Sequence, residues 1–462
     1  MDKLFQQIIE TASTKCRMRP GRILVALSGG PDSVALLHLL HEIKHLLDIE
    51  VVAGHVHHHL RESADEDAEF CRHLAKTLGI EFQVRHVYPA EARGQRRTSL
   101  ETVARELRYR ALNEMADDMH CQDIAIGHTA NDQAETVLYH FVRGSGLRGL
   151  AGIPYRLERK IRPLLDIWRQ DLLQFLKDRN IPYRLDPTNA DRQLTRNMIR
   201  HEVLPYLRRA LNPALDRILV QSAQIHQEAE MFIHAEAEKA LEETLIEKTE
   251  NKFVLDIEQF WSYFTILRKY MLRNALEQLT KRRLRPDFDL LQRAETLATE
   301  GTVGSRLSLN EEWELLIDHD GLVLWDGSFQ EFEFNPIRPG EEVTLPQDRV
   351  LSISKRIPYR ENVLNRADKN NQFVDADTIE GHFWVRNVKA GDRFYPLGLK
   401  GSKKVFDLLS DRKVPLHKKK ETPVLGCNKG IVWLIGFHLD DRFKIKNSTR
   451  EMYHLQVRER SE

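Results

Sequence analysis

The sequence predicts an α/β protein with a doubly wound parallel sheet first, a mostly helical domain next and a small α+β domain last. Short aliphatic runs alternate with amphipathic helices from Ile23 to Val142, which is typical of parallel strands joined by helical crossovers. Alanine, glutamate and leucine dominate after Leu215, and short strands with Gly and Pro turns follow Ser328. A chain of 462 residues suggests about three domains. We expect them at 1–212, 213–345 and 346–462.

Composition narrows the class of protein. The 69 basic residues balance the 69 acidic ones, so any site for a polyanion requires local segregation of charge. The four cysteines, Cys16, Cys71, Cys121 and Cys427, form no CxxC pair, which favours a reduced, cytoplasmic protein. The first residues form no apolar leader, and no apolar run is long enough to cross a bilayer. We therefore expect neither export nor a membrane partner.

The first strand leads into a predicted phosphate loop. This loop consists of Ser28, Gly29, Gly30, Pro31, Asp32 and Ser33, and a helix follows it directly. Two glycines let the backbone approach a ligand, and the unpaired N–H groups at the start of the helix attract an anion. No lysine follows the glycines, so the grip that such a lysine gives the γ-phosphate is missing. Cleavage between the α- and β-phosphates of ATP is favoured, and the alternative is a turn without a ligand.

Further polar residues are expected where the next strands end. Strands are predicted at 51–60, 81–87 and 123–128, and ligands of doubly wound sheets bind beyond the carboxyl ends of the strands. His55, with His57, His58 and His59, is expected to line the nucleotide edge. A zinc site is the alternative, but in a regular strand His58 points away from the other three, which predicts no compact set of ligands.

The segment GHTANDQAET, from 127 to 136, carries the second group of candidates. His128 and Asp132 flank the first turn of a predicted helix, and Glu135 lies near Asp132 on one face. Together with Asp32, Asp132 is expected to bind Mg²⁺ beside a triphosphate, and His128 is expected to be a general base. The alternative is an acidic helix start that complements the helix dipole. Arg105, on the helix predicted over 98–112, is expected to hold a phosphate.

Several of these segments together resemble a known family. SGGPDS resembles the pyrophosphate loop of the N-type ATP pyrophosphatases, the PP-loop ATPases. The whole region from Ser28 to Pro205 resembles the tRNA(Ile)-lysidine synthetase family in these segments: HVHHHLRESADEDAEF, SLETVARELRY, GHTANDQAETVLYHFVRGSGLRGLAG, RPLL, DPTN and RNMIRHEVLP. Two departures stand out. The family often has glycine where His59 stands, and often a second histidine and a second acidic residue in place of Thr129 and Asn131.

The resemblance implies a reaction and its partners. With ATP and Mg²⁺, the enzyme would adenylate C2 of the wobble cytidine in the CAU anticodon of tRNA(Ile), releasing pyrophosphate. L-Lysine would then displace AMP to give lysidine, with His128 as the base, and the tRNA would read AUA instead of AUG. Glu135 and Asp186 are the expected lysine-binding residues.

Basic segments supply candidate tRNA contacts. Arg196 and Arg200 lie on a short amphipathic helix that can grip phosphates. Between Gly391 and Lys420, nine basic residues face three acidic ones, with aromatic residues interleaved. This stretch resembles the C-terminal domain of the same family, which implies acceptor-stem binding by Arg393, Lys403, Lys404, Arg412 and Lys413. The alternative is a solvated lysine-rich surface.

Two other functions remain open at this point. A tRNA thiolase of the pyrophosphatase group would need a reactive cysteine near the site, whereas Cys71 and Cys121 lie in segments that are predicted to be buried. A non-catalytic tRNA-binding module would not need Asp32, His128 and Asp132 together. A homodimer is a further open hypothesis.

Overall fold

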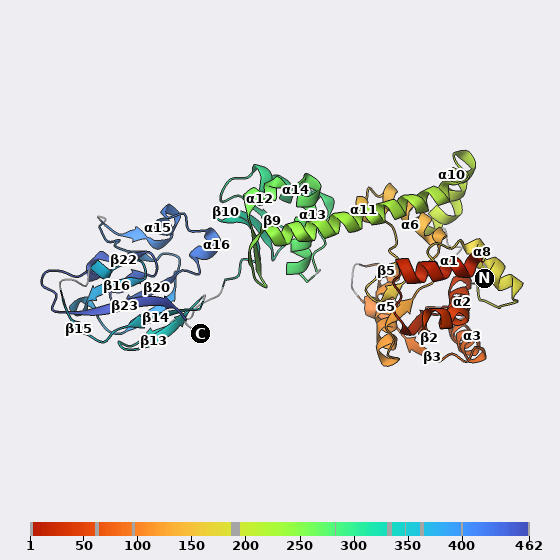
Figure 1. The fold of residues 1–462 in the computed structure, drawn as a ribbon, viewed down its shortest axis with the longest axis horizontal. Coiled ribbons are helices and arrows are strands. Elements are labelled where there is room, and N and C mark those ends of the chain that lie inside the picture. The colour runs from red at the N-terminus through yellow and green to blue at the C-terminus, as the bar shows by residue number, and fades with distance from the viewer. Residues whose placement is uncertain are drawn as a thin grey trace. The chain divides into compact units, whose positions relative to one another are not determined.

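The computed structural model describes residues 3–60, 64–94, 98–185, 195–281, 283–329, 335–346, 348–360, 365–398 and 401–460. The chain forms two compact units, Met1–Phe232 and Ile233–Glu462 (Figure 1). Among the helices of the described residues, none combines the length and the apolar character that a membrane span requires.

The first unit is built on a six-stranded sheet in the order β3-β2-β1-β4-β6-β5. These strands are β1 (Gly21–Ala26), β2 (Ile49–His57), β3 (Phe82–His86), β4 (Asp123–Ala125), β5 (Arg156–Leu157) and β6 (Lys160–Ile161). All neighbours pair in parallel except β5, which runs antiparallel to β6 at the edge. The expected doubly wound parallel sheet is therefore confirmed.

Helices cover both faces of this sheet because the strands are apolar on both sides. Ile23 and Val25 of β1 pack with α1 (Lys3–Glu10), α2 (Pro31–Leu47), α3 (Ala64–Thr77) and α8 (Arg169–Asp178). Leu24, which points the other way, packs against α5 (Leu100–Asp118). Smaller helices in this unit are α4 (Pro89–Arg93), α6 (Ala130–Val142), α7 (Leu147–Leu150), α9 (Thr195–Met198) and α10 (Leu204–Ala210). The layers leave the carboxyl ends of the strands as the edge where the loops gather.

Two strands end earlier than the sequence predicts. β2 stops at His57 rather than at residue 60, and β4 stops at Ala125 rather than at His128. After β2, His59 has a φ of 52°, a left-handed conformation that cannot continue a strand. The polar residues that follow both strands therefore lie on loops, where their side chains no longer alternate.

The long helix expected after residue 215 is α11 (Leu215–Thr244), which runs across the division between the units. In the second unit, an antiparallel sheet has the order β7-β8-β11-β10-β9. Its strands are β7 (Leu245–Lys248), β8 (Lys252–Leu255), β9 (Arg306–Ser308), β10 (Glu314–Asp318) and β11 (Gly321–Trp325). The helices α12 (Ile257–Ser262), α13 (Thr265–Leu279) and α14 (Phe288–Glu300) complete this core. The hairpin of β7 and β8 was not expected from the sequence.

Two antiparallel sheets form the second core of this unit. One contains β12 (Asn335–Ile337), β17 (Phe383–Asn387), β20 (Pro423–Cys427), β21 (Gly430–Leu434) and β22 (His438–Leu439). The other contains β13 (Glu342–Leu345), β14 (Arg349–Ile353), β15 (Ile357–Pro358), β16 (Asn371–Asp375) and β23 (Glu451–Glu459). A two-stranded pair, β18 (Arg393–Phe394) with β19 (Lys403–Lys404), and the helices α15 (Val405–Asp411) and α16 (Leu416–Lys419) carry the basic stretch. The boundaries of the three expected domains remain a prediction, although these two cores lie on either side of residue 330.

Candidate active site

The predicted phosphate loop connects β1 to α2 and is closed by its own serines. The hydroxyl of Ser33 accepts a hydrogen bond from the backbone N–H of Ser28 at 3.1 Å and donates to the carbonyl of Gly30 at 2.9 Å. Gly29 has a φ of 84°, which an L side chain rarely adopts, and Pro31 occupies the first turn of α2. The loop thus forms a turn at the N-terminus of α2, which is the positive end of the helix dipole.

Asp32, on the first turn of α2, is held by an arginine from α8. Arg169 Nε lies 3.1 Å from both carboxylate oxygens of Asp32, and Arg169 Nη2 also donates to Oδ2. The same Nη2 lies 3.9 Å from Asp132 Oδ2. Burial raises the pKa of Asp32, although Arg169 opposes the shift. Two carboxylates from separate loops therefore meet around one guanidinium.

Asp132 is fixed more firmly than Asp32. Its Oδ2 accepts from the backbone N–H and the hydroxyl of Thr129, each at 2.8 Å, so that it caps its own helix α6. Its Oδ1 accepts from Arg200 at 3.1 Å. Arg200 also binds both oxygens of Glu135, at 2.6 and 2.8 Å. The site therefore contains three carboxylates and two arginines that bind one another.

A glycine lets the two loops approach each other. A Cβ atom on Gly127 would lie 3.2 Å from the backbone carbon, the carbonyl oxygen of Asp32 and the nitrogen of Ser33. The loop after β4 therefore packs directly on the phosphate loop, which brings Asp132 toward Asp32.

The tautomer of His128 is determined by its neighbour Arg162. Arg162, which is buried, donates from Nε to His128 Nδ1 at 3.1 Å and from Nη1 to the carbonyl of Pro154 at 2.8 Å. A guanidinium can only donate, so Nδ1 must accept and the neutral imidazole carries its proton on Nε2. In this arrangement His128 presents a donor at Nε2. Its expected role as a general base remains a prediction.

Arg105, Arg108 and Lys160 surround the ring of Tyr109, and we call this cationic cluster the cationic wall. The guanidinium carbons of Arg105 and Arg108 lie 5.1 and 5.3 Å from the centre of the Tyr109 ring, and Lys160 Nζ lies 5.4 Å from it. Burial alone would raise the pKa of Tyr109, but Arg105, Arg108 and Arg162 together lower it. This wall suits an anion such as a phosphate group.

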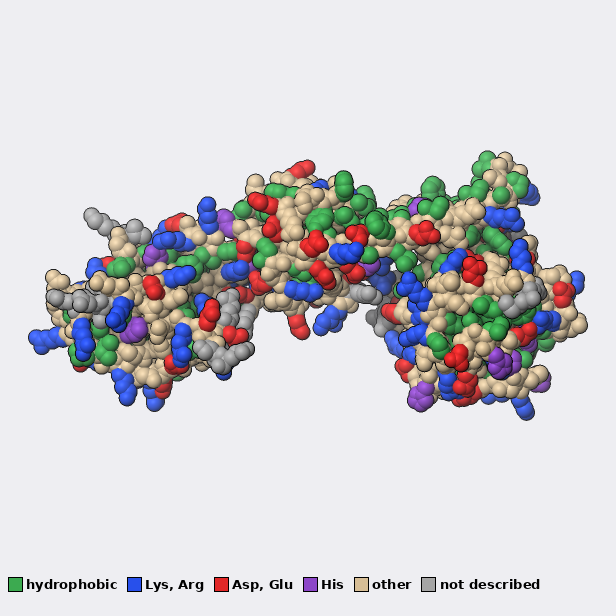
Figure 2. Space-filling model, viewed as in Figure 1, with side chains coloured by type: hydrophobic (Ala, Val, Ile, Leu, Met, Phe, Trp, Pro, Cys, Tyr) green, Lys and Arg blue, Asp and Glu red, His purple; other side chains and the backbone are tan. Residues whose placement is uncertain are grey.

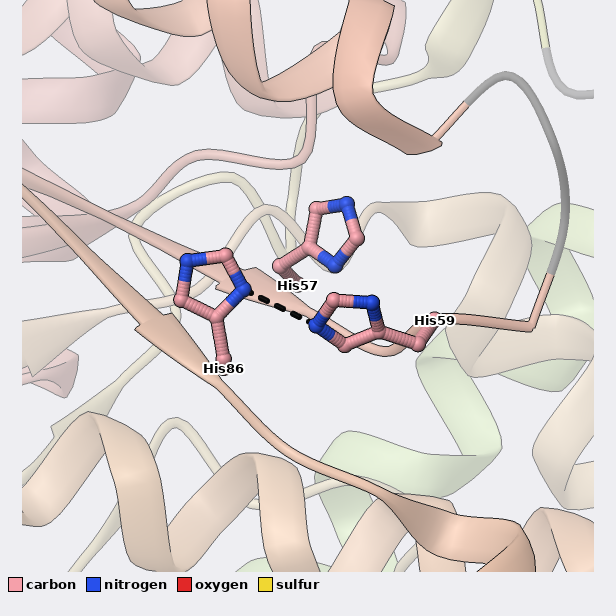
Figure 3. A group of neighbouring side chains, drawn as sticks. All are labelled: His57, His59 and His86. Carbon is pink, nitrogen blue, oxygen red and sulfur yellow. Dashed lines mark hydrogen bonds between the residues drawn. The ribbon is translucent and has the colours of Figure 1, made fainter.

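The histidines at the end of β2 and just after it have two different environments. His55 is buried and donates from Nδ1 to the carbonyl of Leu27 at 2.9 Å, which ties β2 to the start of the phosphate loop. His57 and His59 instead gather with His86 of β3 (Figure 3). The four histidines from His55 to His59 do not gather as one set, but two of them meet a third ring from the neighbouring strand, because β2 ends before His59.

The other expected contacts have mixed positions. Glu135 is buried against Arg200, so Arg200 lies in the site rather than on a solvated face. Asp186 and the side chain of Arg196 lie outside the described residues. No sequence pattern pointed to Arg169, whereas Arg162 lies in the RPLL segment that carried part of the resemblance.

Some of the C-terminal basic residues bind neighbouring side chains, and others are exposed. Lys403 binds Asp411, Arg393 binds Ser402 at 3.0 Å, and Arg412 contacts His438 at 2.7 Å. Lys404 and Lys413 are exposed. On the face seen in Figure 2, basic side chains are spread over this part of the molecule among acidic and neutral ones.

The comparisons with known proteins cover most of the chain. A family model described as the PP-loop domain matches residues 1–207, and one described as the TilS substrate C-terminal domain matches residues 383–457. The tRNA(Ile)-lysidine synthase of Symbiobacterium thermophilum is 33% identical over 464 residues, which is 96% of this chain and 96% of that protein. That of Clostridium perfringens (strain ATCC 13124) is 30% identical, covering 93% of this chain and 94% of the relative.

A solved structure, the U34-tRNA thiolase NcsA from Methanococcus maripaludis, is 18% identical and has a TM-score of 0.42, covering 49% of this chain and 81% of its own. This similarity is too weak to bear on function.

Proposed function

The chain belongs to the tRNA(Ile)-lysidine synthase family, and from this premise we propose how its own residues divide the work of the reaction. It is a tRNA-modifying ligase with an ATP-binding PP-loop domain, and its activity is that of a tRNA(Ile)-lysidine synthase. Lysine is joined to C2 of the wobble cytidine in the CAU anticodon through an adenylated tRNA, and AMP and pyrophosphate leave. We place this reaction in the cytoplasm.

One observation carries the proposal for the first step: Asp32 and Asp132 come from separate loops and meet around Arg169. Carboxylate oxygens this close together fit a hard cation, so these two residues would hold Mg²⁺. When bound, Mg²⁺ neutralises charge on the departing pyrophosphate. Arg169 holds the same oxygens, so it is the residue that releases Asp32 and becomes available to a phosphate.

The phosphate loop and the cationic wall supply the remaining contacts with ATP. The helix α2 starts at this turn, and the first N–H groups of a helix have no partner within it, which supports pyrophosphate binding there. Arg105 and Arg108 would attract the negatively charged groups of ATP or of the tRNA backbone toward the same edge.

For His128 we propose a donor's role in place of the base's role. Arg162 keeps Nδ1 as an acceptor, so Nε2–H can stabilise the charge that develops on the α-phosphate during adenylation. The proton of the lysine ammonium must then pass to another acceptor. Glu135 is a candidate partner of that ammonium only if Arg200 releases it, because Arg200 occupies both of its oxygens.

The thiolase alternative loses support from the cysteines. Cys16, Cys71, Cys121 and Cys427 are all buried. Burial raises the pKa of Cys71 to about 12 and that of Cys121 to about 11, so neither is a ready nucleophile.

The test is a reconstituted reaction followed by mass spectrometry of the nucleosides. Full-length protein, ATP, Mg²⁺, lysine and a tRNA(Ile) transcript with the CAU anticodon should yield lysidine. Omitting lysine should leave adenylated tRNA, and Asp132→Asn should give neither product. A tRNA(Met) transcript measures selectivity, and a transcript that stays unmodified with every component present would contradict the proposal.

A further inference from the structure

A cluster of three histidines lies outside the residues that the proposed reaction uses. His57 ends β2, His86 ends β3, and His59 lies on the loop that follows β2. One ring nitrogen from each lies within 4.8 Å of the others. Figure 3 shows the three rings turned toward a common centre.

The most buried member has one ring nitrogen without a partner. His57 is 3% exposed, and its Nδ1 has no hydrogen-bond partner among the described residues. A buried polar atom without a partner carries a free-energy cost. The nitrogen that faces His59 and His86 in Figure 3 is the one next to the branching ring carbon, Nδ1. Its lone pair is therefore directed into the cluster.

The backbone also bears a cost to bring the second ring there. His59 has a φ of 52°, a left-handed conformation that favours glycine. Its ring stacks on Tyr88, with centroids 4.5 Å apart and an angle of 11° between the planes. Its Nε2 lies 2.9 Å from His86 Nδ1. A strained residue with a fixed ring is typical of functional positions.

We propose that His57, His59 and His86 form a binding site for a divalent cation of intermediate softness, such as Zn²⁺, with solvent completing the coordination. Imidazole nitrogens are common ligands of this class of cation. Two nitrogens bound at ~2.0–2.1 Å on a tetrahedral ion lie roughly 3.3 Å apart, so the His59–His86 pair needs to open by only a few tenths of an ångström. The proton between these two rings moves to the outward nitrogen of its own ring when the ion binds.

Two surroundings of His57 suit this role. Its Nδ1 is directed into the cluster and has no other partner among the described residues. On its other side, Nε2 lies 3.1 Å from Asp65 Oδ1. Ligating histidines commonly direct their second nitrogen toward a carboxylate, which orients the ring.

The experiment measures metal binding by the tag-free, full-length protein. After chelator treatment, Zn²⁺ is titrated by calorimetry, and Co²⁺ is added separately to detect the visible absorption of a tetrahedral site. We expect one tight equivalent of Zn²⁺. His57→Gln, His59→Asn and His86→Gln should each weaken it by more than the ~10–100-fold loss expected for Asp65→Asn, whose carboxylate only orients a ligand. His59→Asn is chosen because asparagine tolerates the left-handed conformation.

Two controls keep the outcome decisive. His73→Gln removes an exposed histidine of the neighbouring α3 and should leave Zn²⁺ affinity unchanged. His417→Gln removes the histidine of the buried Asp318–Asp320–His417 cluster, and tight binding should persist in it. Thermal midpoints should rise with Zn²⁺ in the wild type and in both controls, but not in the three ligand variants. Absence of a tight equivalent, or its survival in the ligand variants, would overturn the assignment.

Discussion

Two groups of acidic and basic side chains, one in each unit, use similar residues in opposite ways. Around Asp32 and Asp132, the partners Arg169 and Arg200 are 27% and 21% exposed and lie where strands of the first unit end. Around Asp318, the partner His417 is completely buried. The first group can exchange its cations for others at an open edge, whereas the Asp318–His417 pair of the second group is closed to solvent.

The bonds of the second group explain its closure. Asp318, at the end of β10, accepts from the backbone N–H groups of Leu416 and His417 at 2.5 and 3.3 Å and from the His417 ring at 3.1 Å. Lys418 binds Asp320 at 2.7 Å. These contacts attach α16 to the sheet of β7 to β11, and thereby join the two cores of the second unit. Asp132 also has several donors, so exposure makes the difference: the arginines around Asp32 and Asp132 are partly exposed, whereas His417 is completely buried.

The largest effect should come from the exchangeable group. Asp132→Asn removes a carboxylate oxygen from the proposed cation site, so release of pyrophosphate from ATP should fall by at least ~10³-fold, in line with the loss of a main electrostatic contact. Binding of tRNA should change little. The measurement is a pyrophosphate assay beside a filter-binding titration, with Asp318→Asn as the matched variant. Equal loss of activity in both variants would remove the distinction between the two groups.

His128 tests the donor's role within the same group. Removing a preorganised donor typically costs ~10²–10³-fold in rate, so His128→Ala should slow adenylation itself by about that factor. Rapid-quench trapping of adenylated tRNA measures the step directly, and His73→Gln serves as the control. Accumulation of adenylated tRNA at the wild-type rate without lysidine would instead restore the role of a general base.

The closed group should respond in stability. Asp318→Asn places an amide where three donors converge, so we expect a loss of about 3 kcal/mol, a typical figure for charge-assisted hydrogen bonds lost in a buried site. Thermal unfolding monitored with hydrogen exchange over residues 310–330 and 410–425 would locate the loss. Asp289→Asn, an exposed carboxylate on α14, should leave both measurements unchanged. An unaltered hydrogen-exchange pattern in Asp318→Asn would show that the contacts between Asp318 and α16 contribute nothing to stability.

Two lysines of the C-terminal basic stretch test whether a salt bridge keeps a charge from binding tRNA. Lys404→Ala should reduce the log–log salt slope of tRNA binding by roughly 0.7–0.9, the value of one lost phosphate contact. Lys418 is bound to Asp320, so Lys418→Ala should change the slope less while lowering stability. If both slopes remain at the wild-type value, the C-terminal basic stretch is a solvated surface.

The smallest effect concerns the sign of a pH dependence. Burial raises the pKa of Asp32, so this group contributes stability below its unfolded pKa of ~3.9 and loses it as pH rises through the folded value. Burial would also raise the pKa of Asp318, but the bonds from His417 and His319 lower it, so its contribution is present above ~3.9 and disappears at lower pH. At neutral pH and without ligands, relief of the burial of Asp32 offsets part of the cost of removing the main partner of Arg169, so Asp32→Asn should lose less stability than Asp318→Asn. Unfolding midpoints from pH 3 to 8 test this, and an equal or larger loss in Asp32→Asn would contradict it.

The sequence could predict the sheet, the phosphate loop and the carboxylates, because local patterns determine them. The run from Ile23 to Ser33 contains a strand, a turn and a helix start within a few residues. Arg169 and Arg162 could not be found in this way. Each lies more than thirty residues from its partner in the chain, so only the folded sheet brings the pairs Arg169–Asp32 and Arg162–His128 together.

The histidines show the same limit in a sharper form. Alternation along a strand is a sound rule only while the strand lasts, and β2 ends at His57. The φ of His59 and the position of His86 on β3 then decide which rings meet, and neither follows from spacing in one segment.

The buried thiol of Cys71 has a practical consequence for watching the phosphate loop move. A Cβ atom on Gly29 would lie 3.5 Å from Cys71 Sγ, so the thiol packs against the loop itself. Burial raises its pKa to about 12, which keeps it protonated and slow to alkylate while the loop is closed. Any opening of this region exposes the sulfur. The rate at which an alkylating reagent modifies Cys71 therefore measures local opening of this region. ATP bound to the loop should lower this rate.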